Sequence, residues 1–285
     1  METLLELIAQ SGFQGLSWRN AVMFFVAGLL IYLAVKKNYE PLLLIPIGFG
    51  AMLANLPGAF LSASSGYHAE PGQTVPLLQF IYNVGIKTQL LPPVIFLGVG
   101  ALTDFRPLLS RPITLLLGAA AQLGIFVAAL GAFYLFGFTA EEAASIGIIG
   151  GADGPTSIYL TAILAPHLLG AVAVAAYSYM ALVPVIQPPI LRLLTTAEER
   201  AINMPQARPV SQTAVILFPV FITVLTALAI PSSAPLIGML MFGNLLRESG
   251  VTDRLSKTAG GELINIVTVF LGLVVGATMN GDTFL

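Results

Sequence analysis

The sequence predicts an all-α, polytopic transmembrane protein in which some helices are broken or re-entrant. Hydrophobic residues make up 56% of the 285 residues and charged residues only 9%, and the mean hydropathy is +0.89. A soluble domain carries about 25% charged residues. A glycine-rich run also interrupts one of the apolar stretches, at residues 150–156. Lipid is therefore the expected surrounding of most of the chain.

Charge and residue usage exclude several classes of function. The formal net charge is -2 and no long basic run occurs, so the electrostatic footprint of a nucleic-acid-binding protein is missing. The chain has no cysteine and only His68 and His167, which argues against disulfides, a thiolate nucleophile and a zinc or haem site. Residues 1–10 carry Glu2 and Glu6 in place of the basic start of a signal peptide. We expect a short amphipathic helix at the membrane interface there.

The apolar stretches are taken in order against the roughly 20 residues that a spanning helix needs. They cover residues 21–35, 41–61, 90–102, 113–138, 143–164, 167–191, 210–230, 234–246 and 263–278. Asn55 and Pro57 predict a kink near the end of the second stretch. The third is short and opens with Pro92 and Pro93, which indicates a half-helix, and residues 62–88 before it are expected to be polar and turn-rich.

The basic residues indicate which stretch is not a full span. Lys and Arg concentrate in cytoplasmic loops. Ten of the twelve cations lie in four loops, namely Lys36 and Lys37; Arg106 and Arg111; Arg192, Arg200 and Arg208; Arg247, Arg254 and Lys257. If all four loops are cytoplasmic, the chain crosses the membrane only once between residues 138 and 192. Two apolar stretches lie between these residues, so one of them is not a full span. The glycine-interrupted stretch 143–164 is the expected re-entrant or broken helix, because irregular backbone at membrane depth needs protein or a water-filled cavity around it.

One carboxylate lies in the middle of this interruption. Residues 150–156 read GGADGPT, so three glycines and a proline flank Asp153. Broken helices expose main-chain groups that coordinate sodium or protons, and an intramembrane carboxylate costs roughly 3 kcal/mol unless it is paired or functional. Sodium is a hard cation that should bind oxygen. We expect Asp153, Gly151, Thr156 and Ser157 to form a sodium site; the alternative is that Asp153 faces solvent in an ordinary turn.

Two tyrosines lie in the next apolar stretch, away from the interfacial belts where aromatic residues gather. A phenol both donates and accepts hydrogen bonds, so Tyr179 is a candidate hydrogen-bond donor to Asp153 or a proton donor. For Tyr177, packing alone is an equally good interpretation. The charged pairs Arg247-Glu248 and Asp253-Arg254 are expected to lie in a solvated cytoplasmic loop.

Four motifs together resemble a known family. The runs GIIGGADGPTSIYL, AVAVAAYSYMALVPVIQPPI, MLMFGNLLRESGVTDRLS and INIVTVFLGLVVGAT are closely similar to the beta subunit of the sodium-translocating carboxylic acid decarboxylases. These include the oxaloacetate, methylmalonyl-CoA, glutaconyl-CoA and malonate decarboxylases. The resemblance extends through most of the chain, and the GGADGPT run followed at fixed spacing by AYSYM is its most specific part.

The resemblance implies an enzyme that is also a translocase. In this family the subunit releases CO2 from carboxybiotin, couples this step to Na⁺ export and consumes one proton. Asp153 is similar to the essential sodium-binding and coupling aspartate, and Tyr179 to a tyrosine that supplies the proton; these two residues are the implied catalytic residues.

The resemblance also implies cofactors and partners. No lysine has the Met-Lys-Met context of a biotinyl site, so biotin is expected on a partner, the carboxyltransferase alpha subunit, with a small gamma or delta membrane subunit beside it. The implied location is the bacterial cytoplasmic (inner) membrane. The partner selects the carboxylic acid, and the sequence leaves open whether the chain forms a homo-oligomer.

The expected organisation is a single integral membrane domain over residues 1–285. It divides into an interfacial helix (1–18), a first helical repeat (19–164) with the broken segment 143–164, and linking helices with the start of a second repeat (165–285). Family members continue past Asp282 into a second broken segment, so we expect an inverted-repeat architecture whose C-terminal repeat is incomplete here.

Two other functions fit the same composition. A secondary transporter that moves an organic acid with Na⁺ and does no chemistry would have similar broken helices. A purely structural anchor for other subunits would not need Asp153 at all.

Overall fold

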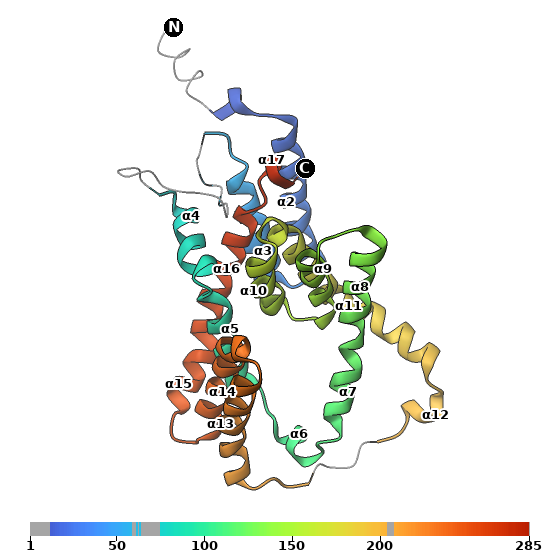
Figure 1. Cartoon of the computed structure of the whole chain (residues 1–285). Helices are drawn as coiled ribbons and strands as arrows, with labels where there is room; N and C mark the ends of the chain where they lie inside the picture. Colours follow the sequence, from blue (N-terminus) through green and yellow to red (C-terminus); the bar gives the residue numbers. More distant parts are fainter. Residues whose placement is uncertain (1–11, 59–60, 62, 64–74, 204–207, 285) are drawn as a thin grey trace.

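The computed structural model describes residues 12–58, 61, 63, 75–203 and 208–284, and every regular element in these ranges is a helix (Figure 1). Within the described residues, four helices are long and apolar enough to cross a membrane, or up to six if each bent pair forms one span. The prediction of an all-α polytopic membrane protein is confirmed. The interfacial helix expected over residues 1–10 lies outside the described residues, and the chain enters α2 at Trp18 after a short turn of 3-10 helix.

The elements that form the bundle are bounded as follows: η1 Gly12–Gly15, α2 Trp18–Lys37, α3 Pro41–Ala54, α4 Leu77–Tyr82, η2 Asn83–Lys87, α5 Leu91–Leu102, α6 Arg106–Ser110, α7 Thr114–Ala121, α8 Leu123–Phe136, α9 Ala140–Gly147, η3 Ile148–Gly151, α10 Gly154–Leu164, η4 Pro166–Leu168, α11 Leu169–Leu194, α12 Ala197–Arg200, α13 Gln212–Ala229, η5 Pro231–Ser233, α14 Ala234–Glu248, α15 Asp253–Thr258, η6 Ala259–Leu263, α16 Ile264–Ala277 and α17 Gly281–Phe284.

Two predicted boundaries were wrong. The second stretch ends at Ala54 and does not continue past a kink, because the residue before Pro57 is biased away from helical conformation. Residues 77–87, expected to be polar and turn-rich, form a helix that ends in a π-helical turn and meets α5 at 64°. The half-helix predicted for residues 90–102 is therefore confirmed as one arm of a bent pair.

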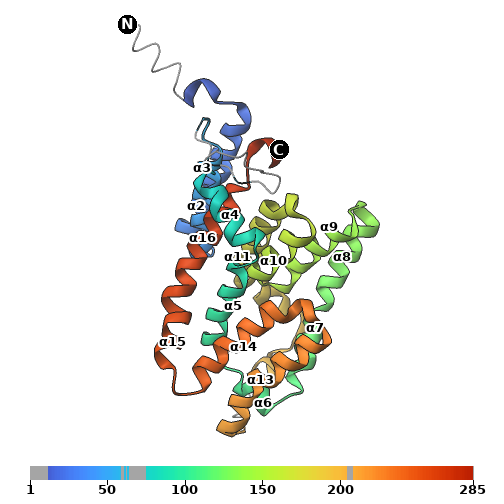
Figure 2. The ribbon, with the colours of Figure 1, turned by 60° about the vertical axis from the view of Figure 1, so that its left-hand side comes forward.

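The core is centred on α2, α3 and α16, which lie side by side (Figures 1 and 2). Two glycines bring α3 and α16 into backbone contact. A Cβ on Gly50 would lie 2.9 Å from the carbonyl carbon of Leu273, and one on Gly276 would lie 2.9 Å from that of Ile47. Small residues allow such close approach where the apolar solvent gives no hydrophobic drive. Neither position has room for alanine.

A second crossing, between α5 and α14, repeats this arrangement. A Cβ on Gly100 would lie 2.8 Å from the carbonyl carbon of Leu240, and one on Gly243 would lie 2.9 Å from that of Leu97. In both crossings each glycine faces the carbonyl three residues before the partner helix's glycine. The same contact geometry thus occurs twice in the bundle.

A buried asparagine joins three helix ends above the first crossing. The Asn55 side chain donates to the carbonyls of Ala51 (2.8 Å) and Met279 (2.7 Å) and accepts from the amide of Gly281 (2.8 Å), while its own carbonyl accepts from Asn20 (3.0 Å). Buried polar groups need such partners. Asn55 therefore replaces the helical hydrogen bonds lost where α3 ends.

The interpretation of residues 247–248 as part of a solvated loop was wrong for Glu248. This side chain is 3% exposed in the last turn of α14, and the guanidinium of Arg106 contacts both of its oxygens. The Nε of Arg247 lies 3.4 Å from it. Asp253 and Arg254 are exposed, as expected. Helix α14 packs along α5. This packing places Arg106, which lies just beyond the end of α5, over the Glu248 side chain and buries it.

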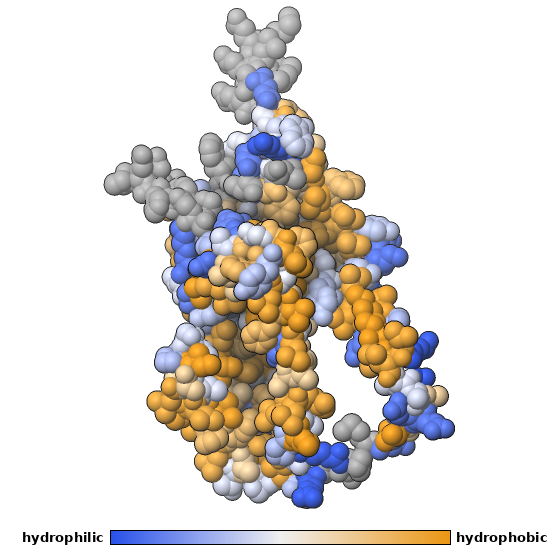
Figure 3. All heavy atoms as spheres, turned by 45° about the vertical axis from the view of Figure 1, so that its right-hand side comes forward, coloured by the Kyte–Doolittle hydropathy of each residue, from blue (hydrophilic) through white to orange (hydrophobic). Residues whose placement is uncertain are grey.

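Apolar side chains also cover the outer surface. Only 6% of an 18-residue apolar stretch within residues 114–136, formed by α7 and α8, is buried within the chain, and only 11% of α13. Hydrophobic residues cover most of the face seen in Figure 3, and hydrophilic residues gather at its lower edge and again in its upper half. Such a surface is suited to lipid or to other membrane helices.

Candidate functional site

The predicted break in the stretch 143–164 is confirmed. The 8-residue α9 runs into the 3-10 turn η3, and the 11-residue α10 starts after a gap of two residues. Neither helix approaches the roughly 20 residues of a span. Ala152 has φ 53°, in the left-handed region that disfavours residues with a Cβ. Asp153 follows in extended conformation, with φ −129° and ψ 99°.

Asp153 is the N-cap of α10. One carboxylate oxygen accepts from the Thr156 amide (3.3 Å) and the other from the Thr156 hydroxyl (2.7 Å). The Ser157 hydroxyl donates to the Asp153 carbonyl (2.9 Å). A negative charge is stabilised at the amino end of a helix, where amides are unsatisfied. The structure thus brings together Asp153, Thr156 and Ser157, and their expected role in holding sodium stays a prediction.

Helix α8 packs against the near side of the break. A Cβ on Gly147 would lie 2.9 Å from the Ile125 carbonyl oxygen, and one on Gly151 would lie 3.3 Å from the Ile125 side chain. The side-chain oxygen of Gln122 would lie 3.9 Å from the same Gly151 position. Gln122 was not singled out by the sequence analysis as a residue near the break. Its position could have indicated this, because Gln122 is a polar amide inside an apolar span, where α7 ends and α8 begins.

Tyr177 of α11 packs against the far side of the break. A Cβ on Gly154 would lie 2.6 Å from the Tyr177 hydroxyl oxygen and closer still to two ring carbons. The side chain is fully buried, and its hydroxyl has no hydrogen-bond partner among the described residues. A buried, unpartnered phenol therefore lies beside the residue that follows Asp153.

Tyr179 lies elsewhere on α11. It is 38% exposed, and the hydrogen bonds of the Asp153 side chain in the described part of the chain go to Thr156 alone. Residues two positions apart in an α-helix are rotated by about 200° from each other around the helix axis. Tyr177 and Tyr179 therefore face nearly opposite ways. The proton-supplying role of Tyr179 stays a prediction.

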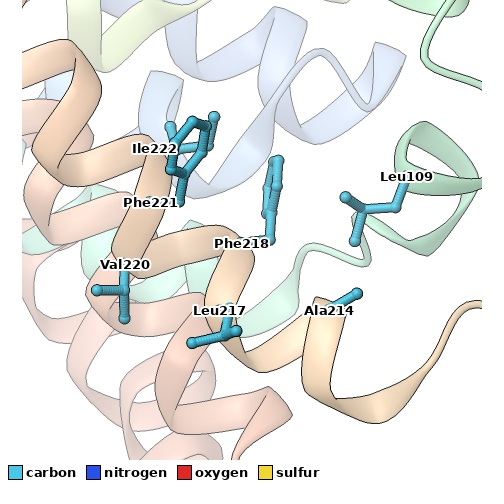
Figure 4. A pocket seen from close by; sticks show the side chains of 7 residues that line it. All are labelled: Leu109, Ala214, Leu217, Phe218, Val220, Phe221 and Ile222. Carbon is cyan, nitrogen blue, oxygen red and sulfur yellow. The ribbon is translucent and has the colours of Figure 1, made fainter.

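A separate cavity on the lower part of the molecule has a different character (Figure 4). It has a volume of about 570 Å³, and its lining comes from α13 with one residue of α6: Leu109, Ala214, Leu217, Phe218, Val220, Phe221 and Ile222. All of these side chains are hydrocarbon. Such a lining offers no ligand for a cation and no group for acid–base chemistry, so the break around Asp153 remains the candidate site.

Comparison with known proteins finds similar sequences along almost the whole chain. Residues 19–285 match the family described as Na+-transporting oxaloacetate decarboxylase beta subunit. The glutaconyl-CoA decarboxylase subunit beta of Acidaminococcus fermentans is 54% identical, with 99% of this chain and 72% of the relative aligned. The methylmalonyl-CoA decarboxylase subunit beta of Propionigenium modestum is 52% identical over 100% of this chain and 75% of the relative. The oxaloacetate decarboxylase beta chain of Klebsiella pneumoniae is 49% identical over 100% and 77%.

Proposed function

Since this chain belongs to the family of Na⁺-transporting oxaloacetate decarboxylase beta subunits, we propose that it releases CO2 from carboxybiotin and uses this step to export Na⁺. The observation that carries the proposal is the half-buried carboxylate of Asp153 at a break between two short helices. Asp153 with the Thr156 and Ser157 hydroxyls and the main chain around Gly151 forms an oxygen-rich group with one negative charge. Such a group suits a hard monovalent cation.

Competition between Na⁺ and a proton for Asp153 supplies the coupling. In the chemical step, the bond between the biotin nitrogen and the carboxylate carbon breaks, its electron pair stays on nitrogen and a proton binds there, so that biotin and CO2 leave. Tyr179 delivers that proton. Na⁺ and the proton exclude each other because both bind the same carboxylate.

The reaction requires a second protein chain that carries biotin. Lys36, Lys37, Lys87 and Lys257 lack a biotinyl context, so biotin arrives on the alpha subunit, with a small gamma or delta subunit completing the complex. The complex lies in the bacterial cytoplasmic membrane, with the Lys- and Arg-bearing loops inside. The three relatives are named for three different substrates at similar identity, so the alpha subunit selects the acid.

The proposed architecture is one integral membrane domain built from two inverted repeats. The α3–α16 and α5–α14 crossings support this organisation. Each joins a helix of residues 19–164 with a helix of residues 165–285, and both use the same glycine-to-carbonyl contact. Related repeats would produce such a pairing.

The test is CO2 release from carboxybiotin by the purified protein as Na⁺ is varied. We expect Na⁺-stimulated release that Asp153→Asn abolishes, because the amide keeps the shape but loses the charge. Asp253→Asn, at an exposed position in α15, is the matched control and should behave as the unchanged protein does. Na⁺-stimulated release that persists in Asp153→Asn would contradict the proposed ion site. If release is absent and the protein alone takes up organic acid with Na⁺ in liposomes, it is a transporter.

A further inference from the structure

We propose that the phenol oxygen of Tyr177 is part of the cation site at Asp153, a role that rests on the proposed sodium-pump function. The first support is burial without a partner. The Tyr177 side chain is fully buried, and its hydroxyl makes no hydrogen bond to any residue that the structure describes. Burying a hydroxyl without a partner costs free energy. Ser145 and Ser157, equally buried, avoid this cost by donating to the carbonyl four residues earlier, an option that the long tyrosine side chain lacks.

The second support is the position of the hydroxyl. The ring lies on Gly154, and the hydroxyl oxygen would be only 2.6 Å from a Cβ at that residue. Gly154 directly follows Asp153, so glycine at this position leaves the space that the phenol fills. Tyr177 is thereby held against the break by α11, independently of the hydroxyls of Thr156 and Ser157, which come from α10 itself.

The third support is the chemistry of the phenol group. A neutral phenol adds an oxygen ligand without adding a second negative charge. A single Na⁺ therefore still neutralises the carboxylate of Asp153, which matters in a medium where net charge is expensive.

The experiment measures Na⁺ binding and not turnover. The melting temperature of the purified protein in detergent is measured at increasing NaCl, with choline chloride reduced to keep the ionic strength constant. A ligand that binds only the folded state raises this melting temperature. Tyr177→Phe keeps the ring on Gly154 and removes only the oxygen. We expect this variant to need about tenfold more Na⁺ for half of the full shift in melting temperature, a factor that corresponds to 1.4 kcal/mol. Tyr159→Phe, at a 9% exposed tyrosine of α10, is the matched control and should match the unchanged protein.

Each outcome separates this inference from the proposed function. Equal half-saturation in Tyr177→Phe and the unchanged protein overturns the role of Tyr177 and leaves the pump intact. No Na⁺ response in the unchanged protein overturns the proposed sodium site, and this inference with it. If Tyr177→Phe does not fold, 3-fluorotyrosine introduced at position 177 decides the question. Its ¹⁹F resonance should move with NaCl and not with choline chloride, and an unmoved resonance contradicts the proposal.

Discussion

Replacing Gly154 by alanine tests how closely α11 packs on the break. The added methyl would lie 2.6 Å from the Tyr177 hydroxyl oxygen and closer to two carbons of the ring. The fully buried ring has no free space to move into. Overpacking of this kind costs about 1–3 kcal/mol, whereas alanine in a helix gains up to about 1 kcal/mol over glycine. We expect Gly154→Ala to lower the free energy of unfolding by about 1–2 kcal/mol.

The assay is reversible unfolding of the purified protein in mixed micelles, followed by circular dichroism. The matched control is Gly131→Ala in α8, where an added methyl would meet nothing within 4 Å; this variant should be as stable as the unchanged protein or slightly more so. In a Tyr177→Leu background, Gly154→Ala should lose most of its penalty, because the pair interacts directly. If Gly154→Ala and Gly131→Ala are equally stable, the inferred contact between Gly154 and Tyr177 is wrong.

Two further predictions concern other parts of the bundle. Gly243→Ala should destabilise the protein by about 2–3 kcal/mol or more in the same unfolding assay, because its methyl would lie 2.9 Å from the Leu97 carbonyl carbon and backbone cannot rotate away; stability equal to that of Gly131→Ala would refute the close α5–α14 crossing. The amide of Thr139 and then the side chain of His167 hold the pKa of Glu142 below its ordinary value of 4.5, so Glu142 contributes stability that is present above about pH 4.5 and lost as pH falls through its lowered pKa. Melting temperatures between pH 3 and 7 should therefore fall less steeply towards the acid end in Glu142→Gln, and identical profiles would contradict this linkage.

The features predicted correctly from sequence depend on local composition. The break at residues 150–156 is predicted by glycine, proline and an aspartate inside an apolar stretch. The half-helix that ends at Leu102 is predicted by the short length of its apolar run and by the prolines at its start. Two predictions failed where packing overrides composition. Residues 77–87 are helical because they pack against α16, although their polarity suggested turns. Glu248 is buried because α14 lies along α5, although its charge suggested a solvated loop.

The sequence by itself determined the membrane class, the position of the break and the presence of one carboxylate within it. It also placed two tyrosines in the following helix, but it could not say which of them faces the break. Residues two apart on a helix point about 200° away from each other, so only one can face α10, and the choice depends on how α11 is rotated about its axis. That rotation is set by contacts with α10, which directly precedes α11, and with α3 and α16, which come from distant parts of the chain. The tertiary structure turns Tyr177 onto Gly154 and leaves Tyr179 partly exposed.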